Sequence, residues 1–469
     1  MERRGETEQL AAFATTRDLG YTAEVLEQGK RMILDQLACQ ISGAPLPWSR
    51  AYRAAQTSLG AGSGASVVYY GDGAALDQAA FLNSAFGHGN EFDDTHLASA
   101  THPGSVIIPA VLAIAEHRHL AGRAALEAVI VGAEIMIRIA LAAAPHLHDR
   151  GFYVPSAVGP FGAAAACARL LGLDADGCRN AMAIGGSHSA GLKAFQQGGG
   201  SVKRIVCAIP SMAGLRAAFM ASHGITGPHG VIEGPRGFLN VFAGAYDIEL
   251  LTAGLGKHFH VLGTAFKPVA CNLSTHASVE AVGWLRHEHR LTADDVASIE
   301  IGVSRSAIGD VGGIVEPPDI LGAQSSLAFG AVVRLFRGGN GPHDYHEEDL
   351  RDPRCLDLAR RVTLVVDPIC DEERRTLKNR GAVVTIRTRD GRSLEKRVRF
   401  PKGSPENPLT NAELTAKFTA AVSPLLGLER TARLADCVWD IEQMADVGAL
   451  LPLTLGTREA ALQGGNGPR

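Results

Sequence analysis

Apolar residues recur at three- and four-residue spacing through most of the first half of the chain, which is the period of one face of an α-helix. Two segments, 22–41 and 77–86, show this pattern clearly, and we predict a helix for each. The most apolar long segment, 125–144, contains three charged side chains, Glu127, Glu134 and Arg138. We therefore predict a buried helix there rather than a membrane span.

Proline and aspartate mark the expected starts of the next two helices. Pro160 is favourable in a first helical turn, so we predict a helix over 161–171. The alanines of that helix would let a neighbouring helix approach closely. Another helix is predicted over 177–185, with Asp174 or Asp176 as its N-cap.

Strand patterns begin only in the second half of the chain. Alternating β-branched residues predict strands at 296–303, 362–366, 382–388 and 393–400. The Asp390-Gly391 pair predicts a hairpin turn between the last two.

Helical patterns return after these strands. Thr410 and Glu413 resemble a capping box, which predicts a helix start. We expect that helix to break at Pro424, because proline removes a main-chain hydrogen bond.

The order of these elements predicts a mainly α fold in two domains, and the 469 residues are enough for both. We expect a large all-helical domain made of the N-terminal part, 1–265, and the C-terminal helices, 404–469. A smaller α+β lid domain, 266–403, is inserted between these parts.

Composition and charge narrow the class of protein. The formal net charge of −4 gives no electrostatic reason to expect binding to nucleic acid or to an anionic membrane. The segment 2–9 is charged where a signal peptide would be apolar, so we expect a cytoplasmic protein. The 8 cysteines form no Cys-x-x-Cys pair, which favours reduced core thiols over an iron-sulfur cluster. The chain has no glycine-rich nucleotide-binding motif.

One stretch, 83–104, gathers carboxylates and imidazoles within an alanine-rich chain. Its ionisable residues include Glu91, Asp93, Asp94, His96 and His102. Such groups are costly to bury unless they satisfy one another or a ligand, yet apolar residues surround them. The stretch is therefore the candidate site. Carboxylates and imidazoles could bind a divalent metal there. However, no helical pair of ligands accompanies the cluster, so we do not expect a bound metal.

Four ordered motifs carry a family resemblance. They are Glu91-Phe-Asp-Asp-Thr95 with His102-Pro-Gly, the segment Gly151-Phe-Tyr-Val-Pro-Ser-Ala-Val-Gly159, Val202-Lys203-Arg204, and Phe266-Lys267-Pro followed by Leu273-Ser-Thr-His276. Together they resemble the MmgE/PrpD family, which includes 2-methylcitrate dehydratase, cis-aconitate decarboxylase and iminodisuccinate epimerase. The resemblance extends to Pro401-Lys-Gly. It implies metal-free chemistry without a cofactor, and a homodimer.

Each candidate residue of the polar stretch has a structural alternative. His102 suits acid/base catalysis because its reference pKa lies near 6.5, but it could instead cap a helix. The resemblance implies that Thr95 contacts substrate, and a turn cap is the alternative. Asp93 and Asp94 could serve the site, orient His96 or cap the chain.

Two lysines lie outside that stretch. Lys203 follows Gly198-Gly-Gly200-Ser-Val, whose amides could hold a carboxylate, although a solvated lysine is the alternative. Lys267 lies at the expected domain junction, where clefts form. His276, at the start of the next helix, could support the site from behind.

Four positions depart from the decarboxylase pattern within this resemblance. That pattern has aspartate at Glu91, histidine at Tyr153, histidine at Asn272 and tyrosine at Phe329. This chain agrees with the pattern at Thr95, His102, Lys203 and Lys267. A polyanion-binding scaffold is therefore retained while much of the proton-handling set differs, which favours another reaction of the family. If a lysine lies close, we expect Tyr153 to ionise in the alkaline range.

The sequence thus predicts a cofactor-free lyase of the dehydratase or hydratase type that acts on a small di- or tricarboxylate through a carbanion. The predicted catalytic residues are His102, Tyr153, Lys203 and Lys267. The predicted substrate-binding residues are Glu91, Asp93, Thr95, Asn272 and His276. An epimerase or isomerase, a decarboxylase and a non-catalytic polycarboxylate-binding protein stay open as alternatives.

Overall fold

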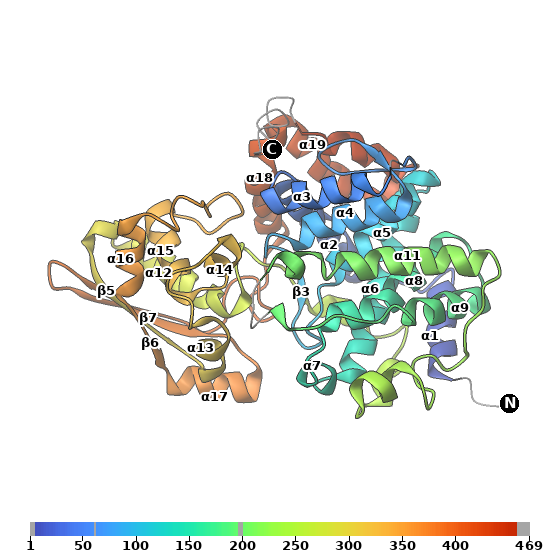
Figure 1. Cartoon of the computed structure of the whole chain (residues 1–469), viewed down its shortest axis with the longest axis horizontal. Helices are drawn as coiled ribbons and strands as arrows, with labels where there is room; N and C mark the ends of the chain where they lie inside the picture. Colours follow the sequence, from blue (N-terminus) through green and yellow to red (C-terminus); the bar gives the residue numbers. More distant parts are fainter. Residues whose placement is uncertain (1–4, 61, 196–199, 457–469) are drawn as a thin grey trace. The chain divides into compact units, whose positions relative to one another are not determined.

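A computed structural model describes residues 5–60, 62–195 and 200–456 and divides the chain into two compact units. The first unit comprises Met1–Gly89, Asp93–Ala265 and Leu414–Arg469, and the second comprises Asn90–Phe92 and Phe266–Glu413. The chain is mostly helical with small sheets, as predicted (Figure 1). The role of the second unit as a lid stays a prediction.

The first unit consists mainly of long helices. They are α1 (Glu6–Thr15), α2 (Ala23–Gly43), α3 (Pro47–Ser58), α4 (Leu76–His88), α5 (Pro103–His117), α6 (Gly122–Ala143), α7 (His146–Asp149), α8 (Val154–Leu170), α9 (Ala175–Gly186), α11 (Ala208–Ser222), α18 (Asn411–Leu426) and α19 (Leu428–Trp439). Short helical turns connect them: η1 (Ser201–Ile205), η2 (Leu239–Ala243), η3 (Ile248–Leu251), η4 (His260–Gly263), η7 (Ile441–Gln443) and η8 (Val447–Thr454).

The expectation of an all-helical first domain was wrong in one respect. Two short antiparallel pairs lie in this unit: β1 (Ala65–Ser66) with β2 (Gly73–Ala74), and β3 (Thr95–His96) with β4 (Thr264–Ala265). Each strand has two residues, too few for an alternating pattern to be recognised in the sequence.

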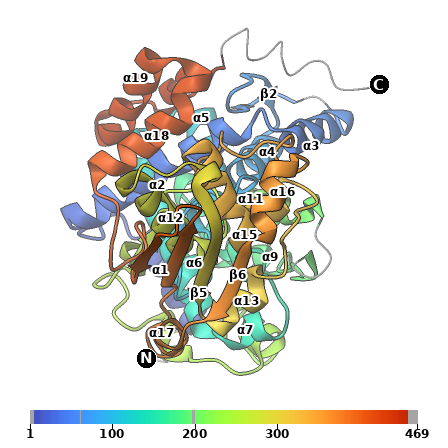
Figure 2. The same cartoon turned by 90° about the vertical axis from the view of Figure 1, so that its left-hand side faces the viewer.

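The second unit is built around one mixed sheet. Its strand order is β6-β5-β7-β8, with β5 (Val296–Val303) parallel to β6 (Val362–Val366), and with β7 (Ala382–Thr388) antiparallel to both β5 and β8 (Ser393–Val398). The helical elements are η5 (Leu273–Thr275), α12 (His276–Glu288), η6 (Ala293–Asp295), α13 (Arg305–Val311), α14 (Ile320–Gln324), α15 (Leu327–Arg337), α16 (Pro353–Arg360) and α17 (Pro368–Leu377). Helix α12 packs against β7 and β8 and also against α15 (Figure 2).

Predictions based on local chemistry were confirmed. The helix predicted over 22–41 forms as α2, and Asp174, one of the two predicted caps, accepts from the Gly177 amide at the start of α9. The Thr410 amide donates to Glu413 at 2.7 Å and the Glu413 amide donates to the Thr410 hydroxyl at 3.2 Å, which completes the capping box. The four predicted strands formed, the last ending two residues early, at Val398.

Both proline predictions were wrong. Helix α8 begins at Val154, with Pro155 in its first turn, and Pro160 lies inside it. Pro424 likewise lies inside α18, and the chain breaks only at Gly427, whose φ of 81° suits glycine. Nearly every residue of α8 is buried, so packing on all sides outweighs the hydrogen bond that Pro160 removes.

The core of the first unit forms where α8 packs against α5, α6, α9 and α11. A Cβ atom on Gly162 would lie 2.5 Å from the Gly132 carbonyl oxygen, so α6 and α8 approach each other through their glycines. The segment Ser201–Ser222 is apolar and long enough to cross a membrane, but 61% of its most apolar window is buried in the fold. A core helix has these same properties.

A buried ion pair on α6 anchors the segment that precedes β4. Glu134 and Arg138 are both buried, and the Arg138 Nε donates to Glu134 at 2.7 Å. The guanidinium also donates to the carbonyls of Ala253 at 2.9 Å and His258 at 2.8 Å. The second Glu134 oxygen accepts from the Val261 amide at 3.0 Å. The pair therefore fixes the path of the chain toward the strand that pairs with β3.

Arg138→Ala is expected to lower the free energy of unfolding by about 3–5 kcal/mol, because the Glu134 carboxylate would stay buried without its partner. Urea unfolding followed by circular dichroism measures the loss. The matched control is Arg123→Ala, since Arg123 pairs with Glu127 but its side chain is 42% exposed. That variant should lose less than about 1 kcal/mol. Equal losses would contradict the role of the buried pair.

Candidate active site

The polar stretch of the sequence lies between the end of α4 and the start of α5. His88 is the last residue of α4, and His102 is the N-cap residue of α5. Between them, β3 pairs with β4, and His96 also forms a bridge with Thr101. These main-chain bonds hold the segment from Asp93 to His102 within the first unit.

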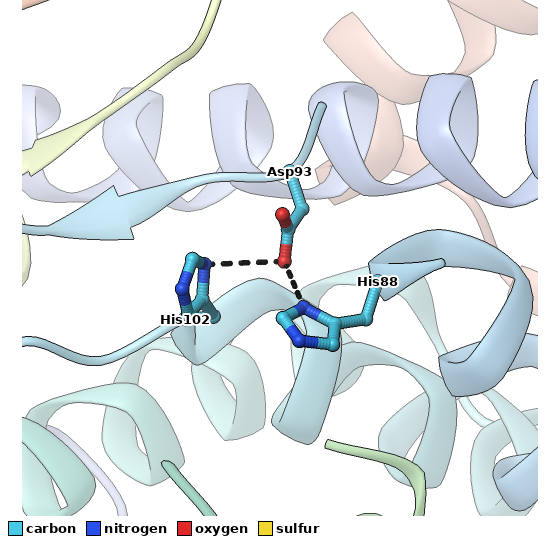
Figure 3. A group of neighbouring side chains, drawn as sticks. All are labelled: His88, Asp93 and His102. Carbon is cyan, nitrogen blue, oxygen red and sulfur yellow. Dashed lines mark hydrogen bonds and ion pairs between the residues drawn. The ribbon is translucent and has the colours of Figure 1, made fainter. Parts of the chain in front are cut away.

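One carboxylate oxygen of Asp93 meets two imidazoles. Figure 3 shows the rings of His88 and His102 on either side of it. The Oδ2 atom lies 2.7 Å from His88 Nδ1 and 3.2 Å from His102 Nδ1. The Ser105 hydroxyl donates to the same oxygen at 2.8 Å. Asp93 and His88 are fully buried, whereas the His102 side chain is 14% exposed. Of the three, only His102 is accessible to a substrate.

The tautomer of neutral His102 follows from its main-chain contact. Its Nδ1 lies 2.7 Å from the carbonyl oxygen of Asp94, which can only accept a hydrogen bond. Nδ1 therefore carries the proton, and Nε2 carries the lone pair. Asp93 beside Nδ1 stabilises the imidazolium that forms when Nε2 takes a proton, as the carboxylate of a catalytic triad does. His102 is thus arranged as a base.

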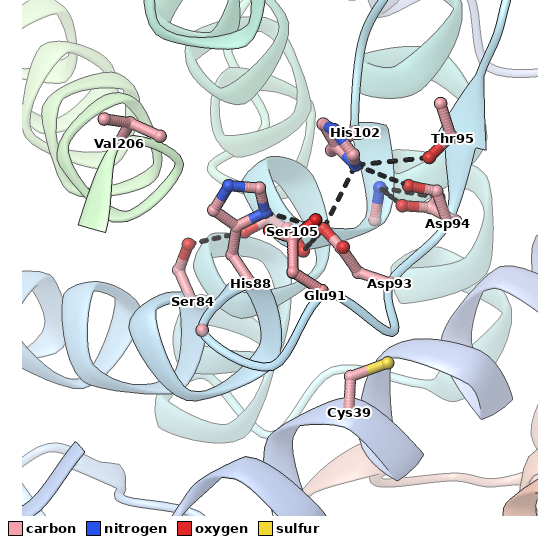
Figure 4. A network of polar contacts seen from close by, with 12 residues as sticks. Cys39, Ser84, His88, Glu91, Asp93, Asp94, Thr95, His102, Ser105 and Val206 are labelled. Carbon is pink, nitrogen blue, oxygen red and sulfur yellow. Dashed lines mark hydrogen bonds and ion pairs between the residues drawn. The ribbon is translucent and has the colours of Figure 1, made fainter. Parts of the chain in front are cut away.

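The alternative of His102 as a capping residue is wrong, because its side chain makes no capping bond to α5. Asp94 performs that task, with its two oxygens 2.9 and 3.1 Å from the Gly104 amide (Figure 4). Burial raises the pKa of Asp94 well above its usual range, and the charges of Asp35 and Asp93 add to the effect. Asp94 is therefore a structural residue of the α5 start.

His96 belongs to the supporting structure as well. Its Nδ1 lies 2.8 Å from the Ser99 hydroxyl, and the idea that Asp93 or Asp94 orients it was wrong. Burial, followed by the charge of His260, lowers the pKa of His96 to about 4. It is neutral at physiological pH. Thr95, unlike His96, contacts the cluster directly, since its hydroxyl lies 3.4 Å from His102 Nδ1.

His88 is the residue of this site that the sequence analysis missed. Burial is the main reason that its pKa falls to about 3, and the positive charges of Lys203 and His102 lower it further, against the raising effect of Asp93. His88 is therefore neutral at physiological pH. A histidine at a helix end has no distinctive spacing, and only its place within the polar stretch could have drawn attention to it.

Tyr153 is directed into the cluster. Its hydroxyl lies 3.3 Å from His88 Nε2, and its ring stacks near that of His102 with centroids 6.5 Å apart. Burial raises the pKa of Tyr153 well above 10, and Cys207 and Asp93 raise it further. The expected alkaline ionisation was wrong, because burial and neighbouring acidic groups dominate over any lysine. Tyr153 remains a phenol.

Two aromatic residues and one carbonyl hold the turn that carries Lys203. The neighbouring Arg204 donates to the Gly89 carbonyl, and its guanidinium lies 3.4 Å from the centre of the Trp48 ring. The Tyr52 hydroxyl donates to the Ser201 carbonyl at 2.6 Å. The turn that carries Lys203 therefore packs against α4. The positive charge of Lys203 acts on His88, the last residue of that helix. The glycines at 198 and 199 lie outside the described residues.

The second unit brings Glu91 and Lys267 together. The ammonium group of Lys267 lies 3.6 Å from Glu91 Oε2, and both side chains are buried. Glu91 has a φ of 53°, in the left-handed region that non-glycine residues seldom occupy. Strain of this kind is common at functional sites. The pair is therefore a candidate element of a substrate site.

Asn272 and His276 contact the main chain of the second unit. The Asn272 Oδ1 accepts from the Ser274 amide at 3.0 Å and caps η5. The His276 Nε2 lies 3.0 Å from the Cys271 carbonyl. Phe329, which replaces a polar residue of the decarboxylase pattern, is buried in α15. The assignment of Asn272 and His276 to substrate binding stays a prediction.

The cluster also contains the ligand types of a metal site. Ligand atoms of His88, Asp93 and His102 lie within 4.8 Å of one another. A cation would have to displace the His88–Asp93 bond and the bond from His102 to the Asp94 carbonyl. The geometry therefore fits a hydrogen-bonded network better than a ligand set.

Comparison with known proteins extends the resemblance over nearly the whole chain. Residues 8–251 match the MmgE/PrpD N-terminal domain, and residues 269–443 match the MmgE/PrpD C-terminal domain. The chain is 30% identical over 453 residues to the cis-aconitate decarboxylase of Aspergillus terreus, with 92% of each chain covered. It is 30% identical over 456 residues to the cis-aconitate decarboxylase-like protein oryM of Aspergillus oryzae, covering 92% of this chain and 94% of that protein. Identity to the Homo sapiens cis-aconitate decarboxylase is 28% over 468 residues, covering 96% and 94% respectively. The chain therefore belongs to the MmgE/PrpD family, as its four sequence motifs indicated.

Proposed function

We propose that this protein is a cofactor-free lyase that eliminates water from, or adds water to, a small di- or tricarboxylate. The observation that supports this proposal best is the arrangement of His102. Its Nδ1 proton is bound to the Asp94 carbonyl at 2.7 Å, and the buried Asp93 carboxylate lies beside it. A general base needs an accepting atom and a stabilised conjugate acid, and this arrangement supplies both.

The proposed elimination uses His102 twice. Its Nε2 removes a proton from the carbon next to a substrate carboxylate, and the electrons of the C–H bond move into that carboxylate. These electrons then form the carbon-carbon double bond as the bond to the hydroxyl breaks. The His102 imidazolium returns its proton to the departing hydroxide, so that water leaves and the base is restored. Hydration is the reverse sequence.

Lys203 and Lys267 are the proposed charge stabilisers. The intermediate concentrates negative charge on one carboxylate, so an ammonium group there stabilises the transition state more than the ground state. The charge of Lys203 already acts on His88 of the cluster. Lys267, beside Glu91 in the second unit, is the proposed anchor of another substrate carboxylate. Thr95, 3.4 Å from His102, is the proposed hydroxyl contact to substrate.

Decarboxylation is the second candidate, because the similar relatives are named cis-aconitate decarboxylases. In that reaction carbon dioxide leaves first, and protonated His102 then gives its proton to the carbanion. The differences at Glu91, Tyr153, Asn272 and Phe329 weigh against it. A protein that only binds polycarboxylates is less favoured, since Tyr153 lies against His88 rather than outside the cluster.

Proton NMR in deuterium oxide separates these reactions. The protein is incubated with citrate, 2-methylcitrate, cis-aconitate and related acids. Water elimination or addition converts the signals of a hydroxy acid into those of the unsaturated acid, or the reverse, with every carboxylate kept. Decarboxylation gives the signals of an acid with one carboxylate fewer, and epimerisation exchanges only the α-proton for deuterium. We expect elimination or addition for at least one acid. Carbon dioxide release as the sole reaction would select the second candidate, and no reaction with any acid would favour binding alone.

The lysines and His102 should affect different kinetic parameters. Lys203→Ala and Lys267→Ala are expected to raise KM as well as lower kcat, because anchors act on ground and transition states alike. His102→Ala should lower kcat by about 100- to 10,000-fold with a smaller effect on KM. Steady-state kinetics measure both. Lys257→Ala is the control, since this lysine is exposed. An unchanged kcat in His102→Ala would refute the assignment of His102 as the general base.

Tyr153 should keep its proton through the alkaline range, because burial raises its pKa well above 10. Between pH 9 and 11, the tyrosinate absorbance of the folded protein and of Tyr153→Phe should rise equally. In urea the variant should titrate one tyrosine fewer, with a midpoint near the reference pKa of about 10. A difference of one tyrosine already in the folded state would show that Tyr153 ionises.

Activity should be insensitive to chelators and to iron reconstitution. The imidazoles of the cluster are engaged in hydrogen bonds, and the cysteines include no clustered ligand set among the described residues. The measurement compares turnover before and after dialysis against EDTA, with metal content determined in parallel. Loss of activity that one added metal restores would instead make His88, Asp93 and His102 its ligands.

A further inference from the structure

We propose that His88 is a positioning residue for the reaction above: as a neutral imidazole it keeps the buried Asp93 carboxylate ionised and directed at His102, while the Tyr153 hydroxyl fixes its tautomer. This inference rests on the proposed function for its purpose, but it concerns contacts that exist without substrate.

Asp93 Oδ2 receives a short hydrogen bond from His88. The distances are 2.7 Å to His88 Nδ1, 2.8 Å to the Ser105 hydroxyl and 3.2 Å to His102 Nδ1. Asp93 is fully buried, so protein donors must replace the water that would otherwise stabilise its charge. A donor to the charged form of a carboxyl group favours its ionisation, and His88 is such a donor at 2.7 Å.

The position of His88 itself is fixed by its helix. The Ser84 hydroxyl, one turn earlier in α4, donates to the Ser105 carbonyl of α5 at 2.6 Å. The next residue, Gly89, accepts a hydrogen bond from Arg204. The end of α4 is thereby held against α5 on one side and against η1 on the other. The His88 ring has little room to leave Asp93.

The tautomer of His88 follows from its two neighbours. With Asp93 ionised, Nδ1 must carry the proton that it donates, so Nε2 can only accept. The Tyr153 hydroxyl, which can donate, lies 3.3 Å from Nε2. The hydrogen bond from Tyr153 to Nε2 therefore stabilises the His88 tautomer whose Nδ1 proton is donated to Asp93.

The neutrality of His88 keeps the charge of Asp93 available to His102. The charged and titratable groups that act on His88 are Asp93, Lys203 and His102, with Tyr153 in contact. Burial, followed by the charge of Lys203, lowers the pKa of His88 to about 3, against the raising effect of Asp93. A charged His88 would neutralise Asp93 in place of the His102 imidazolium. Because His88 is fully buried, it acts through Asp93 and does not touch substrate.

The test uses the apo protein, so that it is independent of any activity. Diethyl pyrocarbonate modifies histidine in its neutral form and not as the imidazolium, and peptide mass spectrometry gives the modification rate of His102 at each pH. Asp93→Asn should lower the midpoint of that pH dependence by about one pH unit, because the anionic neighbour is lost. His88→Phe should lower it in the same direction. His88→Asn, whose amide can reproduce the Nδ1 donor, should keep the midpoint near that of the parent.

The double variant His88→Phe/Asp93→Asn decides whether His88 acts through Asp93. If it does, the double variant should show the midpoint of Asp93→Asn alone. A midpoint in His88→Phe that is unchanged or raised would overturn the proposal, as would a further shift in the double variant. His88→Leu, which also lacks a donor, replaces His88→Phe should the latter fail to fold, and His223→Asn, at an exposed histidine, is the control. Absence of lyase activity in the parent would refute the proposed function and leave this result intact.

Discussion

A carboxylate shielded from water stays ionised only if hydrogen-bond donors replace the water, and the site of this protein is organised by that requirement at Asp93. Its Oδ2 atom is contacted by His88 from the end of α4 and by His102 and Ser105 from the start of α5. The same contacts therefore satisfy the buried charge and align two helices. They also place the one partly exposed imidazole of the cluster at the surface of the network. The arrangement of the proposed base and the local fold therefore have the same physical cause.

Buried pairs elsewhere in the first unit follow the same rule. Glu134 and Arg138 fix the chain that leads to β4, and Lys417 of α18 lies 2.5 Å from Asp35 of α2. Such pairs add little net stability compared with well-packed apolar residues, but a displaced partner leaves a costly uncompensated charge. Each pair thus disfavours other arrangements of segments that are far apart in the sequence. The Asp35–Lys417 pair fixes the position of the C-terminal helix α18 against α2, although α18 comes after the second unit in the sequence.

The sequence predicted best what depends on neighbouring residues. The Asp174 cap, the capping box of Thr410 and Glu413, and the strands were all readable from local patterns, and the motifs gave the family. Pro160 misled because burial on every side of α8 outweighs its local preference. His88 was missed because its importance arises from Asp93 and Tyr153 through space. The pKa of Tyr153 was misjudged since a sequence does not reveal how completely a phenol is buried.

The cluster also explains how a phenol can stand at position 153, where the decarboxylase pattern has a histidine. Because His88 donates to Asp93, its Nε2 needs a donor, and a phenol or a neutral imidazole can each supply one. The two groups differ in what else they can do: an imidazole can take up a second proton near neutral pH, whereas buried Tyr153 keeps its only one. The exchange therefore removes one proton-transfer group while it leaves the support of His102 intact. The proposed elimination of water needs only one imidazole that takes a proton and returns it, so a phenol at position 153 is compatible with that reaction.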